Sequence, residues 1–74
     1  MNSEQYGREV GQRLREVRVR KRLSLTMVAE RSGTVSAEAL GSYERAERAV
    51  LVEKLADLAG FYGVPVVDLL PDVA

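Results

Sequence analysis

Apolar side chains recur at intervals of three or four residues near the start of the chain, at Tyr6, Val10, Leu14 and Val17. This spacing is typical of an α-helix with one buried face. We therefore expect a helix over residues 3–22 whose other faces are polar. Gly7 and Gly11 lie inside it, and each costs up to about 1 kcal/mol relative to alanine. The first turns must fray or be held by packing.

Two shorter helices are predicted in the middle of the chain. Ser24 is a good N-cap, because its hydroxyl can accept a hydrogen bond from a free amide of the first turn. A helix over 25–32 follows and ends at Gly33, a residue type that tolerates a left-handed cap. Ser36 is a second N-cap and begins a helix over 37–45, in which Leu40 and Tyr43 are expected to face inward.

The last third of the chain predicts two more helices. Residues 51–62 carry apolar side chains at helical spacing, and Gly63 is a natural stop. Pro65 suits the first turn of a final short helix with Leu69 and Leu70, and Pro71 ends it. No stretch shows the alternation of apolar and polar residues that is typical of a β-strand. The sequence therefore predicts an all-α fold of five short helices, in a single domain over residues 1–74.

Charge is unevenly distributed along the chain, although 11 basic and 11 acidic side chains give a formal net charge of zero. Residues 1–24 carry seven basic and three acidic side chains, whereas residues 49–74 carry one and four. A local basic surface can therefore exist in a neutral protein.

Several classes of function are excluded by what the chain lacks. Without cysteine or histidine it has no disulfide, thiolate nucleophile, imidazole base or Cys/His zinc site. We expect no enzyme, because no nucleophile is paired with a base, and we also expect no metal and no cofactor. The longest apolar runs are about four residues, far short of the roughly 20 that span a bilayer. We expect no membrane contact and a cytoplasmic location.

The two short middle helices, joined by residues 33–36, have the spacing of a helix-turn-helix. From Leu14 to Leu70 the chain resembles the lambda-repressor/Cro-type (XRE) family. The similar positions are Leu14-Arg15, Arg18, Leu23-Ser24, Val28-Ala29-Glu30, Ser32-Gly33, Ser36, Leu40, Tyr43-Glu44-Arg45, Leu55, Leu58-Ala59, Tyr62-Gly63-Val64 and Asp68-Leu69-Leu70. Residues 41–45, 48–50 and 61–66 are similar to the N-terminal domain of BldD-type actinobacterial regulators.

The resemblance implies a bacterial transcription regulator, acting as a repressor, that binds two half-sites of double-stranded DNA as a homodimer on the nucleoid. It also implies a partly buried ion pair between Arg18 and Glu44, which would fix the recognition helix. A second, ligand-sensing domain would follow in a longer parent protein.

Candidate DNA contacts follow from the helix over 37–45. With Leu40 and Tyr43 inward, five residues are left on the groove side as base-reading candidates: Ala37, Glu38, Gly41, Ser42 and Arg45. Ordinary helix surface is an equal alternative for Ala37 and Gly41, and a helix-dipole role for Glu38. The candidates for phosphate contact are Ser24, Thr26, Thr34, Ser36, Arg48, Arg20 and Arg22. For Arg20 and Arg22 the alternative is a solvated helix end whose charge complements the helix dipole.

Three departures from the family pattern bear on these assignments. Leu25 stands where members commonly carry a glutamine that contacts phosphate, so that contact is absent or made differently. The segment from Gly33 to Glu44 is one residue longer than usual. Leu51 replaces the usual serine or threonine cap of the helix over 51–62, which costs about 1 kcal/mol.

The sequence is also compatible with a second function. Zero net charge, small side chains on the recognition helix and an exposed Leu51 also suit a protein-interaction module of antitoxin-like or coactivator-like type. The acidic and apolar segment from Val64 to Ala74 could be a self-association face, although closure of the core is the simpler role. Recovery of a stoichiometric protein partner would favour the interaction module.

Overall fold

The computed structural model describes residues 1–71, which form four α-helices and one short 3-10 helix. The elements are α1 (Ser3–Arg20), α2 (Leu25–Ser32), α3 (Ala37–Glu44), α4 (Val52–Tyr62) and η1 (Val66–Leu69). The expected all-α fold is confirmed, with a 3-10 helix as its fifth element. Pro65 precedes η1 as its N-cap and does not lie in its first turn.

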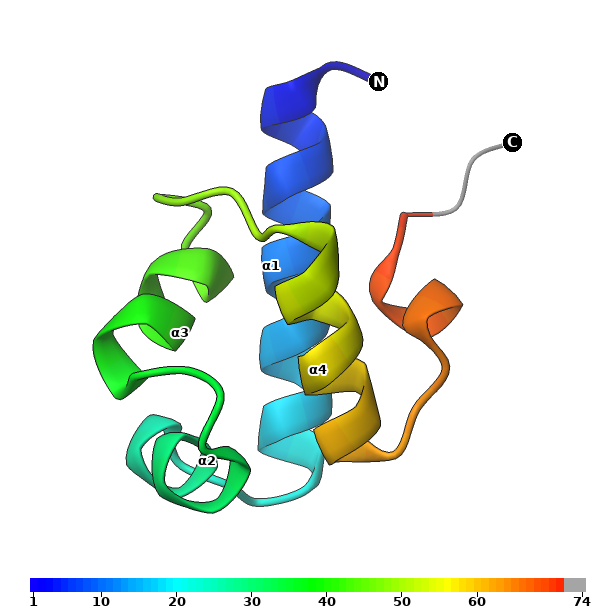
Figure 1. Ribbon diagram of the computed structural model, residues 1–74. Coiled ribbons are helices and arrows are strands. Elements are labelled where there is room, and N and C mark those ends of the chain that lie inside the picture. The colour runs from blue at the N-terminus through cyan, green and yellow to red at the C-terminus, as the bar shows by residue number, and fades with distance from the viewer. Residues whose placement is uncertain (72–74) are drawn as a thin grey trace.

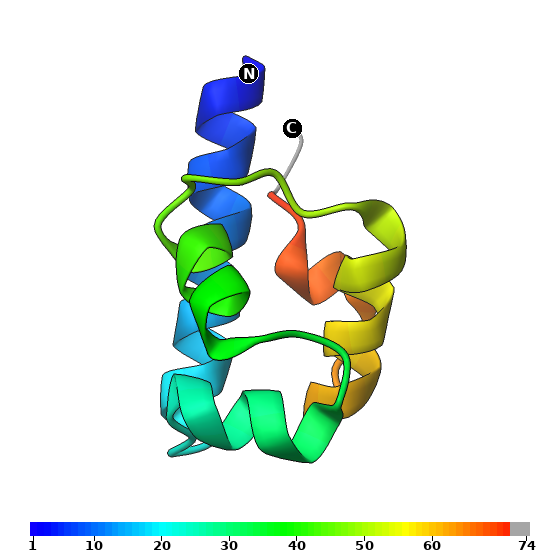
Figure 2. The same ribbon diagram turned by 60° about the vertical axis from the view of Figure 1, so that its left-hand side comes forward.

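The long helix α1 is the support on which the other elements are arranged (Figure 1). Both α3 and η1 pack against α1, α2 packs against α3, and α4 contacts η1. Figure 2 brings α2, the turn after it and α3 toward the viewer. The pair α2–α3 therefore lies on one side of the molecule, while η1 and α4 close the core from another.

The core is formed by the inward faces of all five elements. Its fully buried side chains are Leu14, Val28, Leu40, Leu58 and Leu69. The expected burial of Tyr6 is wrong, because its side chain is 46% exposed. Tyr6 instead lines an open cavity of about 310 Å³ between the start of α1, the α3–α4 link, α4 and η1. The helical period continues there, but the other elements among residues 1–71 lie across this open cavity and leave Tyr6 partly exposed.

The C-terminus of α1 comes two residues before the predicted end. Arg22 has a φ of 59°, and the amide of Leu23 donates to the carbonyl of Arg18 at 3.1 Å. This left-handed closure ends a helix by satisfying its last carbonyls. A similar closure ends α3 at Glu44, so Arg45 is the cap residue and not part of the helix.

Leu51 caps α4 without any side-chain hydrogen bond, as the sequence indicated. Its backbone is extended, with φ −66° and ψ 148°, and its side chain is 74% exposed. A serine there could accept a first-turn amide without backbone change. We expect Leu51→Ser to raise the free energy of unfolding by about 1 kcal/mol, measured by urea denaturation. Leu51→Ala, which cannot cap, should give no such gain.

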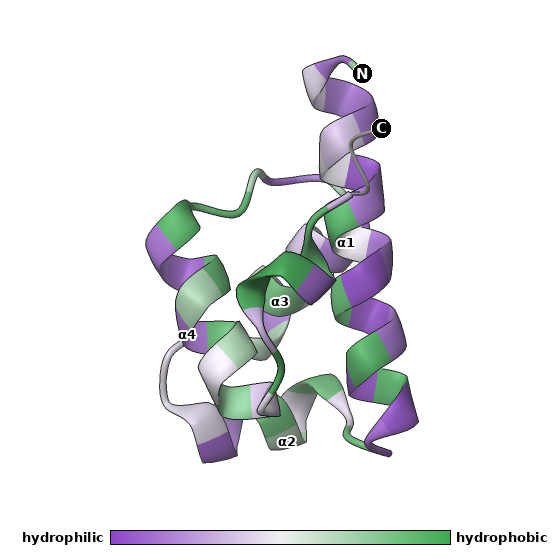
Figure 3. Cartoon of the chain, turned by 90° about the vertical axis from the view of Figure 1, so that its right-hand side faces the viewer, coloured by the Kyte–Doolittle hydropathy of each residue, from purple (hydrophilic) through white to green (hydrophobic). Residues whose placement is uncertain are grey.

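Hydropathy differs between the faces of the domain. Figure 3 shows mostly apolar colouring on η1, whereas hydrophilic and apolar residues alternate along α1. Three side chains near η1 and the start of α4 are largely exposed apolar groups: Leu51, Val52 and Val67. Within residues 1–71, no helix combines the length and apolar character needed to cross a bilayer.

Candidate nucleic-acid interface

The α2–turn–α3 unit is shaped by three local signals. The Ser24 hydroxyl accepts the amide of Met27 at 3.0 Å, and the Ser36 hydroxyl accepts the amide of Ala39 at 3.0 Å. Gly33 ends α2 with a φ of 66°. The remaining first-turn amides of both helices stay available to anionic groups. The predicted bounds 25–32 and the start of α3 at Ala37 are confirmed.

The turn itself is held from the other side by α4. The ammonium group of Lys54 donates a hydrogen bond to the backbone carbonyl of Thr34. The Thr34 hydroxyl is in turn 3.3 Å from the hydroxyl of Ser32. Sequence reasoning missed Lys54, because nothing local links a lysine on α4 to a carbonyl 20 residues earlier.

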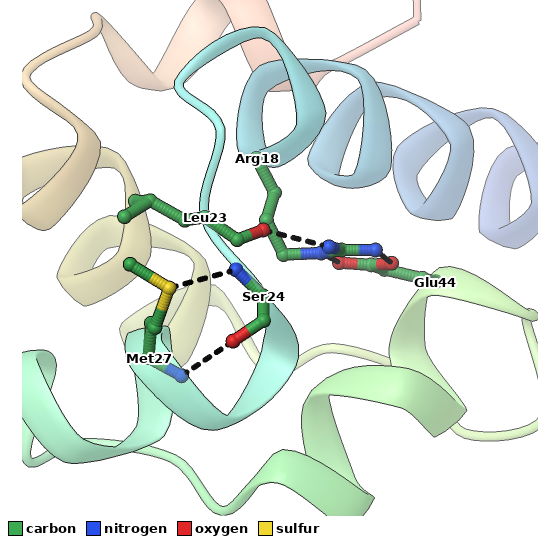
Figure 4. Close-up of polar contacts among 5 residues, drawn as sticks. All are labelled: Arg18, Leu23, Ser24, Met27 and Glu44. Atoms are coloured by element: carbon green, nitrogen blue, oxygen red, sulfur yellow. Dashed lines mark hydrogen bonds and ion pairs between the residues drawn. The ribbon is translucent and has the colours of Figure 1, made fainter.

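Arg18 and Glu44 form the predicted ion pair, which joins α1 to the end of α3 (Figure 4). Arg18 Nε lies 2.7 Å from Glu44 Oε2, and Nη2 lies 2.8 Å from Oε1. Nη1 also donates to the carbonyl of Leu23 at 2.9 Å. The side chains are 12% and 4% exposed, and hydrogen bonding to Glu44 raises the pKa of Arg18. One guanidinium thus fixes α3 and the link before α2 to the same point on α1.

Tyr62 lies in the core in the electrostatic field of this ion pair. Its hydroxyl has no hydrogen-bond partner among residues 1–71. Burial, with a further contribution from the Glu44 charge, raises its pKa from 10.0 to about 12. The folded state therefore holds the phenolic proton more tightly than the unfolded state does.

We expect this difference to make the domain less stable in alkali. The contribution of Tyr62 is fully present below about pH 10 and is lost as the pH rises toward about 12. Tyr62→Phe should weaken this pH dependence without lowering stability at pH 7, because the hydroxyl that it removes is unpaired. Denaturation of both proteins at pH 7, 9 and 11 measures this. A large loss of stability at pH 7 would contradict the prediction.

The outward side of α3 presents polar groups, but one of the five predicted base-reading residues does not lie there. Glu38 and Arg45 are exposed, and Ala37 and Ser42 are partly exposed. The expectation that Gly41 lies on the open side is wrong, because Gly41 is buried. A Cβ there would lie 2.9 Å from Arg45 Nη1 and 3.4 Å from Leu25 Cδ1.

Leu25 therefore has a packing role where the family commonly places a polar residue. It is half-buried and packs against the core, and its proximity to Gly41 brings the first turn of α2 against the middle of α3. No phosphate contact can come from this apolar side chain. The neighbouring Thr26 is exposed and remains a candidate for that contact.

Basic side chains lie at both ends of the α2–α3 unit. Arg20 and Arg22 are exposed at the end of α1, just before α2. Arg48 is exposed after α3, with its guanidinium carbon 5.9 Å from the centre of the Tyr43 ring. This distance suits a cation–π contact that would hold Arg48 beside the unit.

Arg45 is paired with Glu47, a residue that sequence reasoning did not select. Arg45 Nη2 lies 3.0 Å from Glu47 Oε1, and both side chains are more than half exposed. Their mutual hydrogen bond raises the pKa of Arg45 and lowers that of Glu47. The opposite charges two residues apart were the available signal, but the backbone turn between them was not predictable.

Comparison with known proteins identifies the family that shares this fold. The helix-turn-helix family model matches residues 14–69. Two structures of the BldD DNA-binding domain, one of them from S. venezulae, are each 51% identical to this chain. Their TM-scores are 0.88 and 0.85, covering 95% and 90% of this chain and 100% and 99% of theirs.

A more distant structural relative is the restriction-modification controller protein C.AhdI from Aeromonas hydrophila. It is 33% identical, with a TM-score of 0.79, and the match covers 85% of this chain and 94% of that one. A search of curated protein sequences gave no match. Hydroxypropylphosphonic acid epoxidase from S. wedmorenis has a TM-score of 0.85 but only 16% identity, over 97% of this chain and 38% of the enzyme, so this likeness is one of fold alone.

The family match over most of the chain and the 51% identities show that this protein belongs to the XRE-type helix-turn-helix family.

Proposed function

We propose that this chain is a sequence-specific, double-stranded DNA-binding transcription regulator that acts as a repressor in the bacterial cytoplasm. The observation that carries the proposal is the α2–turn–α3 unit, with α3 presenting an exposed polar side. An α-helix with its side chains is about 10–12 Å wide, which fits the roughly 12 Å major groove. The matched relatives are described as a DNA-binding domain and a controller protein, in agreement with this role.

In this proposal, α3 contacts the bases and the surrounding groups contact phosphate. Ala37, Glu38, Ser42 and Arg45 are the base-reading candidates, and Gly41 supports Arg45. The phosphate candidates remain Ser24, Thr26, Thr34, Ser36, Arg20, Arg22 and Arg48. A neutral protein can bind DNA in this way, because the charges near the phosphates dominate the attraction.

The proposal is tested by selecting duplexes from a random library and titrating the enriched duplex at two salt concentrations. We expect enrichment of one sequence and an affinity that falls steeply with salt. If excess random duplex competes as well as the enriched duplex, sequence-specific binding is excluded. Capture of a stoichiometric protein partner would then support the interaction module instead.

Arg45→Ala should lower affinity for the preferred duplex by about 1 to 3 kcal/mol, because arginine can bind guanine through two hydrogen bonds. The loss should be much smaller for duplexes changed at the base that Arg45 contacts. Fluorescence anisotropy on a panel of single-base variants measures this pattern. A uniform loss on every duplex would instead assign Arg45 to a phosphate.

We further propose that two copies bind as a homodimer on paired half-sites, about 10 base pairs apart. The exposed apolar side chains of Leu51, Val52 and Val67, which are 74%, 80% and 68% exposed, support a contact between copies. The selected sequence should then have two-fold symmetry, and two chains should bind each duplex in sedimentation experiments. An asymmetric site occupied by one chain would contradict the dimer.

A further inference from the structure

The backbone after α3 turns sharply and brings Glu47 back to the last turn of that helix. Ala46 has a φ of 60°, in the left-handed region. The amide of Glu47 donates to the carbonyl of Ser42 at 2.8 Å, and the amide of Ala46 donates to that of Tyr43 at 3.1 Å. These are the two hydrogen bonds of a Schellman closure. The position of Glu47 is therefore fixed by the backbone.

Arg45 is held between this carboxylate and the surface of Gly41. Its Nη1 lies 2.9 Å from the place where a Cβ on Gly41 would be, so the guanidinium lies against the glycine. Its Nη2 contacts Glu47 Oε1 at 3.0 Å, with no other hydrogen bond to the Arg45 side chain among residues 1–71. Most of the five N–H donors of the guanidinium consequently remain available to a ligand.

This arrangement contributes little to folding. The two side chains are 58% and 57% exposed, and exposed ion pairs contribute little to stability because water and salt screen them. The position of the Arg45–Glu47 pair indicates a role in DNA binding and not in stability. It lies at the C-terminal end of α3 and involves a residue assigned above to contact bases.

We propose that Glu47 is a specificity-determining residue that competes with DNA phosphates for Arg45. This inference rests on the proposed function and extends it. Binding to random DNA depends on basic side chains that neutralise phosphates and release counterions. A carboxylate that already occupies Arg45 reduces this gain and also repels the phosphates. A base pair with two suitable acceptors can still engage the free N–H groups, with Glu47 holding the guanidinium in place.

The first test compares Glu47→Gln with Asp57→Asn, which removes the same charge from an exposed position on α4. Affinities for the selected duplex and for a random duplex are measured at several salt concentrations. Glu47→Gln should bind random duplex up to about fivefold more tightly. Its salt dependence on random duplex should steepen by about 0.9, the value for one added phosphate contact. The ratio of specific to random affinity should fall, whereas Asp57→Asn should leave that ratio unchanged.

The second test asks whether Glu47 acts through Arg45. Glu47→Gln is introduced into Arg45→Ala, and its effect on the affinity ratio should disappear, because no guanidinium is left to release. Circular dichroism should show equal folding of all variants. The proposal is overturned if Glu47→Gln changes both affinities equally, as a distant charge would, or if its effect persists without Arg45. Failure of the proposed function is distinguishable, because the unmodified chain would then show no preference for any duplex.

Discussion

Arg18→Met is expected to lower the free energy of unfolding by about 3 kcal/mol or more. The substitution keeps much of the side-chain length but leaves the Glu44 carboxylate, only 4% exposed, without its two hydrogen bonds. A buried charge that loses its partner typically costs about 3 to 5 kcal/mol. The Leu23 carbonyl also loses its side-chain donor. Urea denaturation at pH 7 measures the loss.

A double-mutant cycle separates the pair from the rest of the site. Glu44→Leu alone should also destabilise the domain, but Arg18→Met with Glu44→Leu should be less unstable than the sum of the single variants, since no uncompensated charge remains. The partly exposed Glu9–Arg13 pair on α1 provides a control, because Arg13→Met should change stability by well under 1 kcal/mol. Unchanged stability of Arg18→Met, together with lost DNA binding, would show that Arg18 contacts DNA and not the scaffold.

The sequence predicts those parts of the fold that are encoded locally. Ser24, Gly33 and Ser36 mark the ends of the two helices through their own hydroxyls or backbone freedom, and the bounds of α2 match the prediction. Leu40 and Tyr43 follow from helical spacing and are buried. These features depend on residues within one helical turn of each other.

The features that the sequence could not predict depend on distant elements or on the backbone. Tyr6 continues the apolar spacing of α1, yet it is exposed because an open cavity separates it from the other elements among residues 1–71. Gly41 is covered by Arg45, which folds back toward Glu47 only because Ala46 adopts a left-handed conformation. Neither outcome is encoded by spacing within a single helix. The ion pair between Arg18 and Glu44 spans 26 residues of sequence, and it was predicted only through the family resemblance.

Gly11→Ala is expected to destabilise the domain by about 3 kcal/mol, although alanine is the better helix former. A Cβ at this position would lie 2.5 Å from the backbone carbonyl oxygen of Tyr43 and 2.7 Å from that of Glu44. Backbone atoms cannot rotate away as a side chain can, so α1 and α3 would have to separate. Overpacking of a tight contact typically costs about 1 to 3 kcal/mol, and occasionally more. The separation would also strain the Arg18–Glu44 pair, which joins the same two helices.

Gly7→Ala is the matched control, because Gly7 lies on the same helix one turn earlier and a Cβ there would meet no heavy atom of residues 1–71 within 4 Å beyond its neighbours in the helix. This variant should gain stability, by up to about 1 kcal/mol, from the higher helix propensity of alanine. The same substitution at two positions four residues apart is thus expected to have opposite signs, which thermal denaturation of both variants can decide. Equal gains would show that α1 and α3 approach less closely than the two carbonyl distances require. A loss at Gly11 alone would establish that the missing side chain allows α3 to pack against its support.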